Sequence, residues 1–172
     1  MVPFTVVMAL LGSCSQSPEP LHTDHELKML DDTIINYNQQ VVQSENQEIE
    51  DFARRYRWQM KISPTGLRSM IYKNGQGKQA GKEKMATIQY TVKKLNGDII
   101  ERTDPDHPLI FELGKQQVPN GLEEGVLLMR TGDHAKLIVP SHLAFGLLGD
   151  LDKIYHRTTL VYDVHLMDVK EK

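Results

Sequence analysis

"VPNGLEEGVLLMRTGDHAKLIVPSHLAFG", residues 118–146, is the stretch that decides the fold. A turn leads into a short apolar segment whose Leu122, Val126 and Met129 fall on one face of a helix. A second turn precedes the β-like run "HAKLIVP", and a third turn closes the stretch. No nucleophile–base pair, metal-ligand cluster or phosphate loop is present in it. Its chemistry must therefore rest on an apolar surface.

Strand patterns lie on both sides of this short helix. Five further segments alternate or have the length of strands: Leu67–Tyr72, "MATIQYTVKKL", "DIIERT", "PLIFEL" and "TTLVYDVHLMDV". Asn96-Gly97 separates the second segment from the third and suits a two-residue hairpin turn. Strands around one short helix predict an antiparallel α+β arrangement over residues 66–170.

The chain before residue 63 has a helical pattern. Leu27, Leu30, Ile34, Tyr37 and Val41 recur at spacings of three and four, as on one stripe of a helix. This stripe packs on its own domain, pairs two chains as a homodimer or docks a partner. It has too few heptads for a coiled coil.

Two sequence signals mark the start or the end of a helix in this part of the chain. Ser44-x-x-Gln47 has the form of a capping box, which could start a second helix. "SPTG" at residues 63–66 ends the helical part, because Pro64 cannot continue a helix. We expect a helical segment at 26–62 and a second domain at 63–172.

Composition excludes several classes of function. The chain has 172 residues, a net charge of −3 and 40% hydrophobic residues, which suits one globular domain with an appendage. It is neither basic enough to predict nucleic-acid binding nor biased enough to predict disorder. No apolar run reaches the length of about 18 residues that predicts a membrane-spanning helix. His22-x-x-His25 lacks further ligands, so we expect neither a metal site nor a cofactor.

The first 14 residues resemble a bacterial lipoprotein signal. An apolar stretch from Val6 to Leu11 leads to Gly12-Ser13 and then to Cys14, the chain's one cysteine. The resemblance implies a signal peptide at 1–14, a lipid on Cys14 and a linker at 15–25. It further implies a lipid-anchored protein of the bacterial cell envelope, facing the periplasm and attached to the outer membrane. The missing Lys or Arg near Met1 departs from that pattern, and the alternative is a buried helix with a core cysteine.

Landmarks along residues 64–170 resemble the FK506-binding-protein type of peptidyl-prolyl cis-trans isomerase. In order they are Gly66-Leu67, Gly75-Gln-Gly77, "IQYTV", Asn96-Gly97, "FELGKQQV", Gly121 with "EEGV", Met129, Gly132, "AKLIVP", Ala144-Phe145-Gly146 and "TLVYDVHLMDV". The resemblance implies an antiparallel half β-barrel wrapped around one short helix, with an apolar pocket between them. It also implies proline-containing polypeptides as clients and an activity that needs no cofactor.

Such an activity fits a stretch with almost no reactive groups. Rotation about a peptide bond costs about 18–20 kcal/mol and, before proline, takes tens to hundreds of seconds unaided. No bond is broken, so no nucleophile or general base is required. A dry pocket that binds the twisted amide better than either planar form lowers the barrier.

The resemblance also implies which residues form the pocket. They are Tyr90, Ile100, Glu101, Leu109, Val118, Pro119, Leu122, Phe145, Ile154 and Tyr162. Taken singly, each apolar member could equally be a core residue. "GLLGDLDKIYHR" is the loop expected to overhang this pocket.

Four positions depart from the family pattern. Phe145 stands where the family usually has a tyrosine, so the hydroxyl donor is missing. Pro119 replaces an isoleucine whose N–H binds ligand, and proline has no N–H. Leu122 replaces a tryptophan, and Ile100-Glu101 replaces a Phe-Asp pair.

Losing one donor should cost about tenfold or less, since a net hydrogen bond contributes about 0.5–1.5 kcal/mol. We therefore expect an isomerase that assists the folding of exported proteins. The first alternative is a chaperone or binding module with weak catalysis, and a further one is a structural component of an envelope assembly.

Overall fold

The computed structural model describes residues 24–172, with side chains from residue 28 onward. The predicted signal peptide, Cys14 and His22 lie outside the described residues, so lipid attachment stays a prediction. By packing, the chain forms two compact units, Met1–Gln39 and Gln40–Lys172. No helix in the described part of the chain is both long enough and apolar enough to cross a membrane.

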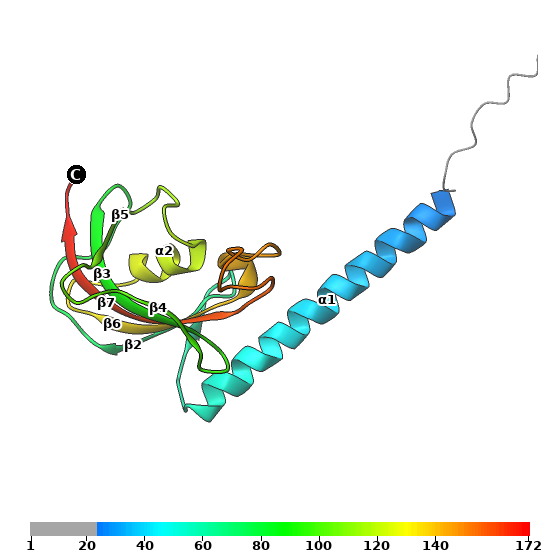
Figure 1. Cartoon of the computed structure of the whole chain (residues 1–172), viewed down its shortest axis with the longest axis horizontal. Helices are drawn as coiled ribbons and strands as arrows, with labels where there is room; N and C mark the ends of the chain where they lie inside the picture. The colour runs from blue at the N-terminus through cyan, green and yellow to red at the C-terminus, as the bar shows by residue number, and fades with distance from the viewer. Residues whose placement is uncertain (1–23) are drawn as a thin grey trace, which may run out of the picture. The chain divides into compact units, whose positions relative to one another are not determined.

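A single helix, α1 (Asp24–Arg55), occupies most of the N-terminal segment (Figure 1). It runs without a break through Ser44-x-x-Gln47, so the expectation of a second helix starting there is wrong. Ile49 and Phe52 beyond it are buried, and this packing favours continuing the helix over capping it. Leu30 and Ile34, in the first unit, are exposed. The pairing of two chains through the apolar stripe that contains them stays a prediction.

The end of α1 has a specific cause. Arg57 has a left-handed backbone with a φ of 55°, and the Trp58 N–H donates to the Ala53 carbonyl at 2.9 Å. This is the hydrogen-bond pattern of a Schellman motif, which satisfies carbonyls at a helix end. The helix thus stops at Arg55, and Lys61–Ile62, predicted as helical, form strand β1 instead.

The second unit contains one antiparallel sheet. Its other strands are β2 (Arg68–Lys73), β3 (Met85–Lys94), β4 (Ile99–Arg102), β5 (Leu109–Glu112), β6 (His134–Val139) and β7 (Leu160–Lys170). The strand order is β1-β2-β6-β7-β3-β4, and β5 also pairs with β3. The hairpin predicted at Asn96-Gly97 is present, with Gly97 at a φ of 98° and β4 paired to β3. The sheet curls around one face of a short helix, α2 (Asn120–Leu127), as Figure 1 shows.

Two glycines allow α2 to approach the sheet closely. A Cβ on Gly121 would lie 2.4 Å from Val139 Cγ1, and one on Gly125 would lie 2.3 Å from Leu137 Cδ1. Real Cβ atoms essentially never come this close, so a side chain at either position would displace Val139 or Leu137. The predicted α+β fold, an antiparallel half-barrel around one short helix, is confirmed.

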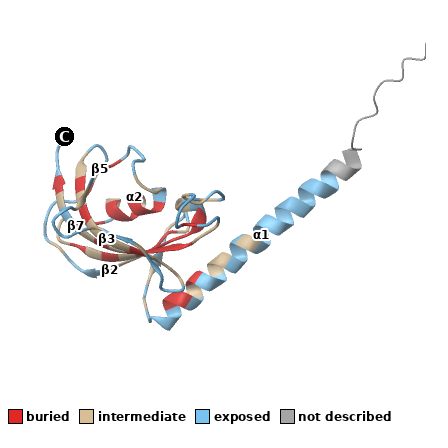
Figure 2. Ribbon diagram, viewed as in Figure 1, coloured by how far each residue is buried: buried red, intermediate tan, exposed pale blue. Residues whose placement is uncertain are grey.

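Two apolar clusters stabilise the second unit. The larger lies between α2 and the sheet and includes Phe111, Leu137 and Leu166. The smaller lies on the other face, where Ile49, Phe52 and Ala53 of α1 pack against Ile138 and Val161. Figure 2 shows both as buried segments of α1, α2 and the central strands. The packed unit therefore begins at Gln40, earlier than the predicted domain start at residue 63.

Candidate functional site

A cavity of about 360 Å³ lies between α2 and the sheet, and all ten predicted pocket residues line it. They come from elements that are far apart in the sequence. Tyr90 lies on β3, Ile100 and Glu101 on β4, Leu109 on β5 and Tyr162 on β7. Val118 and Pro119 precede α2, Leu122 lies on α2, and Phe145 and Ile154 belong to the connection before β7.

The inner end of the cavity is apolar. Leu122 is 2% exposed and Tyr162 is 3% exposed, so both are core residues that also face the cavity. The Tyr90 and Tyr162 rings contact each other at a centroid distance of 5.8 Å and an interplanar angle of 54°. This tilted arrangement is favourable for aromatic pairs and fixes both rings. The two rings together form one aromatic wall of the cavity.

Both phenols in this wall keep their protons at neutral pH. Burial raises the pKa of Tyr90 above its ordinary value, and the nearby Glu101 carboxylate raises it further. Burial also raises the pKa of Tyr162, followed by the influence of Tyr90 and Glu101. A neutral hydroxyl can donate a hydrogen bond, and the Tyr90 hydroxyl already bonds the Glu101 side chain. The Tyr162 hydroxyl is thus a donor in the cavity although Phe145 and Pro119 supply none.

Pro119 has a local role at the start of α2. Its carbonyl accepts the N–H groups of Leu122 at 2.9 Å and Glu123 at 3.1 Å. This role does not require a donor from residue 119, so proline fits there at no cost to the helix. The buried Glu123 in turn accepts N–H groups from Gly114 at 2.7 Å and Gln116 at 3.1 Å. These bonds fix the segment that leads to Val118.

The other wall belongs to residues 141–159, which we call the pocket loop. Ile154 is 6% exposed, whereas Phe145 is 37% exposed at the cavity mouth. Asp150 turns Ile154 inward, because its carboxylate accepts the N–H groups of Ile154 at 2.7 Å and Asp152 at 2.9 Å. The same bonds lower the pKa of Asp150, that from Ile154 most.

Sequence reasoning missed five residues that line this cavity: Val92, Gln117, Asp150, Asp152 and Lys153. Asp150 had a usable pattern, since an aspartate often bonds the backbone N–H two residues on. The three charged residues lie in the loop expected to overhang the pocket, which contains no landmark of the resemblance after Gly146.

The arrangement suits binding of a small apolar group. It offers a small apolar enclosure, two neutral phenols and a charged rim. Across the side chains that the structure describes, no cluster of three or more His, Cys, Asp or Glu could hold a metal ion. A small apolar ring attached to a carbonyl group would fit this combination of surfaces.

Known proteins resemble this chain in both sequence and fold. The family model described as FKBP-type peptidyl-prolyl cis-trans isomerase matches residues 76–167. A probable FKBP-type peptidyl-prolyl cis-trans isomerase FkpA from Neisseria meningitidis is 35% identical over 111 residues, covering 64% of this chain and 40% of that protein. FK506-binding protein 2 from Dictyostelium discoideum is 40% identical over 83 residues, covering 48% of this chain and 62% of that protein. The chain thus spans less than two thirds of these curated relatives.

Two solved structures resemble the fold. A peptidyl-prolyl cis-trans isomerase from Pseudomonas syringae has a TM-score of 0.67 at 22% identity, covering 77% of this chain and 96% of that one. FkpA from Escherichia coli has a TM-score of 0.66 at 24% identity, covering 88% of this chain and 75% of that one. At these identities the comparison concerns the fold alone.

Proposed function

Because the chain belongs to the FKBP-type peptidyl-prolyl cis-trans isomerase family, we propose that it accelerates isomerisation of Xaa-Pro bonds in polypeptide clients. One observation supports this most. The ten residues chosen from the sequence, which are scattered from residue 90 to residue 162, line a single apolar cavity. A set of ordinary core residues would not be expected to surround one opening to solvent.

The proposed mechanism depends on the environment of the amide. The proline ring enters between Tyr90, Leu122 and Tyr162, and water is excluded from it. Amide resonance places charge on the carbonyl oxygen, and the twisted amide loses this resonance. An apolar site therefore destabilises the planar amide relative to the twisted one. No residue forms a covalent bond with the client.

We further propose Tyr162 as a hydrogen-bond donor to the client. Its raised pKa keeps its proton in place, and its ring is fixed by packing against Tyr90. A fixed donor costs little reorganisation when the client binds. Tyr162 would thus partly replace the donors that Phe145 and Pro119 lack.

The outer surface of the pocket loop, next to the cavity, suits extended apolar clients. Leu147, Leu148 and Leu151 of the pocket loop are strongly exposed, Leu151 at 92%, and so is Tyr155. Exposed apolar groups this close together are unusual on a soluble surface and often contact a partner. They support clients with apolar residues beside the proline, such as chains that have not finished folding.

Phe145→Tyr tests the missing donor. The tyrosine adds a hydroxyl at the cavity mouth, where a client carbonyl can reach it. We expect kcat/KM for an Ala-Leu-Pro-Phe peptide to rise by up to about tenfold, the equivalent of one net hydrogen bond. Magnetisation-exchange NMR measures the cis–trans rates directly, without a coupling protease. Phe145→Leu serves as the control that removes the ring and adds no donor.

The same measurement separates the enzyme from the binding module. Catalysis by the unaltered chain supports the isomerase. Rates equal to those of the free peptide, together with suppressed aggregation of a denatured client, would support the binding module instead. A Phe145→Tyr rate equal to the unaltered rate would show that a hydroxyl at this position does not reach the client.

We also propose that the chain is exported and lipid-attached at Cys14. The support is the order Leu11-Gly12-Ser13-Cys14 after an apolar stretch, with no other cysteine in the chain. In a bacterial host fed an alkyne-bearing fatty acid, we expect the full chain to be labelled and to sediment with membranes. Cys14→Ser should remove the label and release the protein. An unlabelled full chain in the soluble fraction would contradict the anchor.

A further inference from the structure

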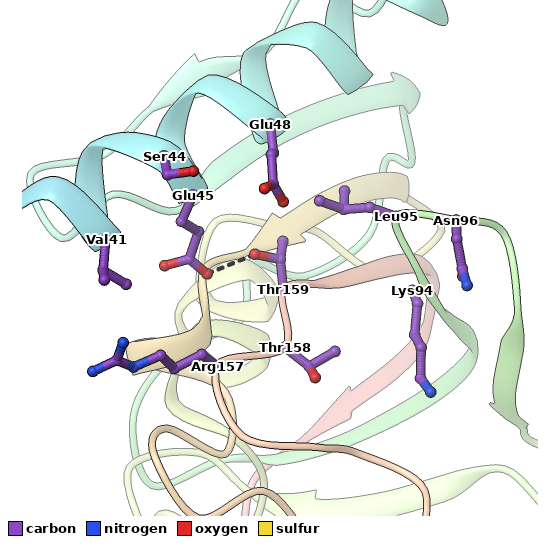
Figure 3. Close-up of a pocket in the computed structure, with 10 residues that line it drawn as sticks. All are labelled: Val41, Ser44, Glu45, Glu48, Lys94, Leu95, Asn96, Arg157, Thr158 and Thr159. Atoms are coloured by element: carbon purple, nitrogen blue, oxygen red, sulfur yellow. Dashed lines mark hydrogen bonds between the residues drawn. The ribbon is translucent and has the colours of Figure 1, made fainter.

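One carboxylate on α1 holds both ends of the pocket loop. Glu45 Oε1 accepts the backbone N–H of Ser141 at 2.6 Å and the hydroxyl of Thr159 at 2.6 Å. Glu45 Oε2 accepts the hydroxyl of Ser141 at 3.1 Å. Ser141 begins the pocket loop and Thr159 ends it, immediately before β7. Figure 3 shows the Glu45 side chain reaching from the helix toward Thr159.

The donors of these hydrogen bonds to Glu45 are buried. Ser141 is 7% exposed and Thr159 is 6% exposed, so the donor side of these bonds is buried, whereas Glu45 itself is half-buried. Around them is a cavity of about 380 Å³, lined by Glu48 and Val41 on the helix side and by Thr158 on the loop side. Bonds to a charged acceptor are stronger than neutral ones, and shielding strengthens them further.

The pocket loop needs such support because its own backbone is strained. Leu151 and Arg157 have left-handed φ values of 65° and 54°, a conformation that side chains disfavour. Inside the loop, the Gly146 N–H donates to Ser141 O and the Arg157 N–H donates to Gly146 O, both at 2.8 Å. These bonds join the loop to itself, and those at Ser141 and Thr159 join it to α1.

We propose that Glu45 is a positioning residue for the cavity: it fixes the pocket loop, and thereby Phe145 and Ile154, from outside the site. The role in turnover rests on the proposed isomerase function. Glu45 does not line the cavity that contains Tyr162 and touches no part of the client. It acts through Ser141 and Thr159. In this way α1, which lies outside the cavity, helps to position the residues that line it.

Glu45→Ala removes all three bonds, whereas Glu45→Gln can keep them. A glutamine oxygen accepts from Ser141 N and Thr159 Oγ1, and its amide donates to Ser141 Oγ. Glu50→Ala is the matched control. Glu50 lies on the same helix and accepts Arg68 Nη2 at 3.2 Å, a bond between helix and sheet that does not involve the pocket loop. Arg68 is buried, so we expect this control to lower Tm as well.

Two readouts on the full chain separate positioning from stability. In Glu45→Ala we expect kcat/KM to fall by about tenfold, less than the roughly hundredfold loss that a misplacement of about 1 Å can cause, because the loop keeps its internal hydrogen bonds. The amide protons of Gly146 and Arg157 should exchange faster with deuterium, while those of β7 keep their protection. Glu45→Gln should restore both values to within about twofold, and Glu50→Ala should change neither, whatever its Tm.

Several results would overturn the proposal. Equal effects of Glu45→Ala and Glu50→Ala on loop exchange would leave Glu45 with a structural role only. Unchanged loop exchange in Glu45→Ala would remove the role altogether. If the unaltered chain lacks isomerase activity, the proposed function fails, but the exchange experiment still decides whether Glu45 fixes the loop.

Discussion

Tyr162→Ala is expected to lower kcat/KM for an Xaa-Pro peptide by about a hundredfold or more, the scale of effect seen when contact groups in a site are displaced. Tyr162 is 3% exposed, faces the cavity and packs against Tyr90, so its loss removes a wall and frees a second ring. Truncating a buried aromatic residue typically costs about 3–5 kcal/mol of stability. Catalysis must therefore be measured at a temperature where circular dichroism shows the variant to be folded.

Tyr162→Phe is the matched control for this substitution. It keeps the ring, the packing and most of the stability, and it removes only the proposed donor. We expect a loss in kcat/KM of about tenfold or less, because one net hydrogen bond contributes about 0.5–1.5 kcal/mol. Equal losses in the two variants would assign the effect to the hydroxyl alone. Full activity in Tyr162→Ala would remove this residue from the site.

Asp133→Ala should strongly destabilise the second unit. Asp133 is buried, and its two carboxylate oxygens accept the N–H groups of Gly75 and Arg130, each at 2.6 Å. Alanine leaves both donors without a partner in a shielded place. Each unsatisfied buried group costs about 1–3 kcal/mol, so for two such groups we expect the free energy of unfolding, measured in urea, to fall by about 2–6 kcal/mol.

Asp133→Asn tests this explanation. Its amide oxygen can accept one of the two N–H groups, and its amide nitrogen cannot accept the other. The expected loss lies between that of alanine and zero. An alanine variant that loses less than about 1 kcal/mol would mean that water or a backbone shift satisfies both donors.

Local patterns in the sequence predicted most of the second unit. Alternation located β3, β6 and β7, Asn96-Gly97 located the hairpin, and the spacing of Leu122 and Val126 located α2. These elements depend on which face of the strand or helix is buried. The order of apolar and polar residues within each short segment shows that face. The cavity was predicted differently, from a resemblance, because its apolar walls cannot be told from core by pattern alone.

What failed depends on contacts between distant residues. The apolar spacing along α1 predicted a helix but not how far this helix extends. Its continuation past Ser44 depends on the burial of Ile49 and Phe52 against Ile138. Glu45 looked like any charged residue of a solvated helix face. Its partners lie 96 and 114 residues further along the chain, and no local pattern connects them.

The central claim is that the cavity lined by Tyr90, Leu122 and Tyr162 catalyses rotation about an Xaa-Pro bond. Its most direct test is magnetisation-exchange NMR on an Ala-Leu-Pro-Phe peptide, with the full chain and with folded Tyr162→Ala at equal concentration. The account predicts that the unaltered chain raises the exchange rate well above that of the free peptide and that Tyr162→Ala does not. Exchange that is equally fast with both proteins, or with neither, would contradict it.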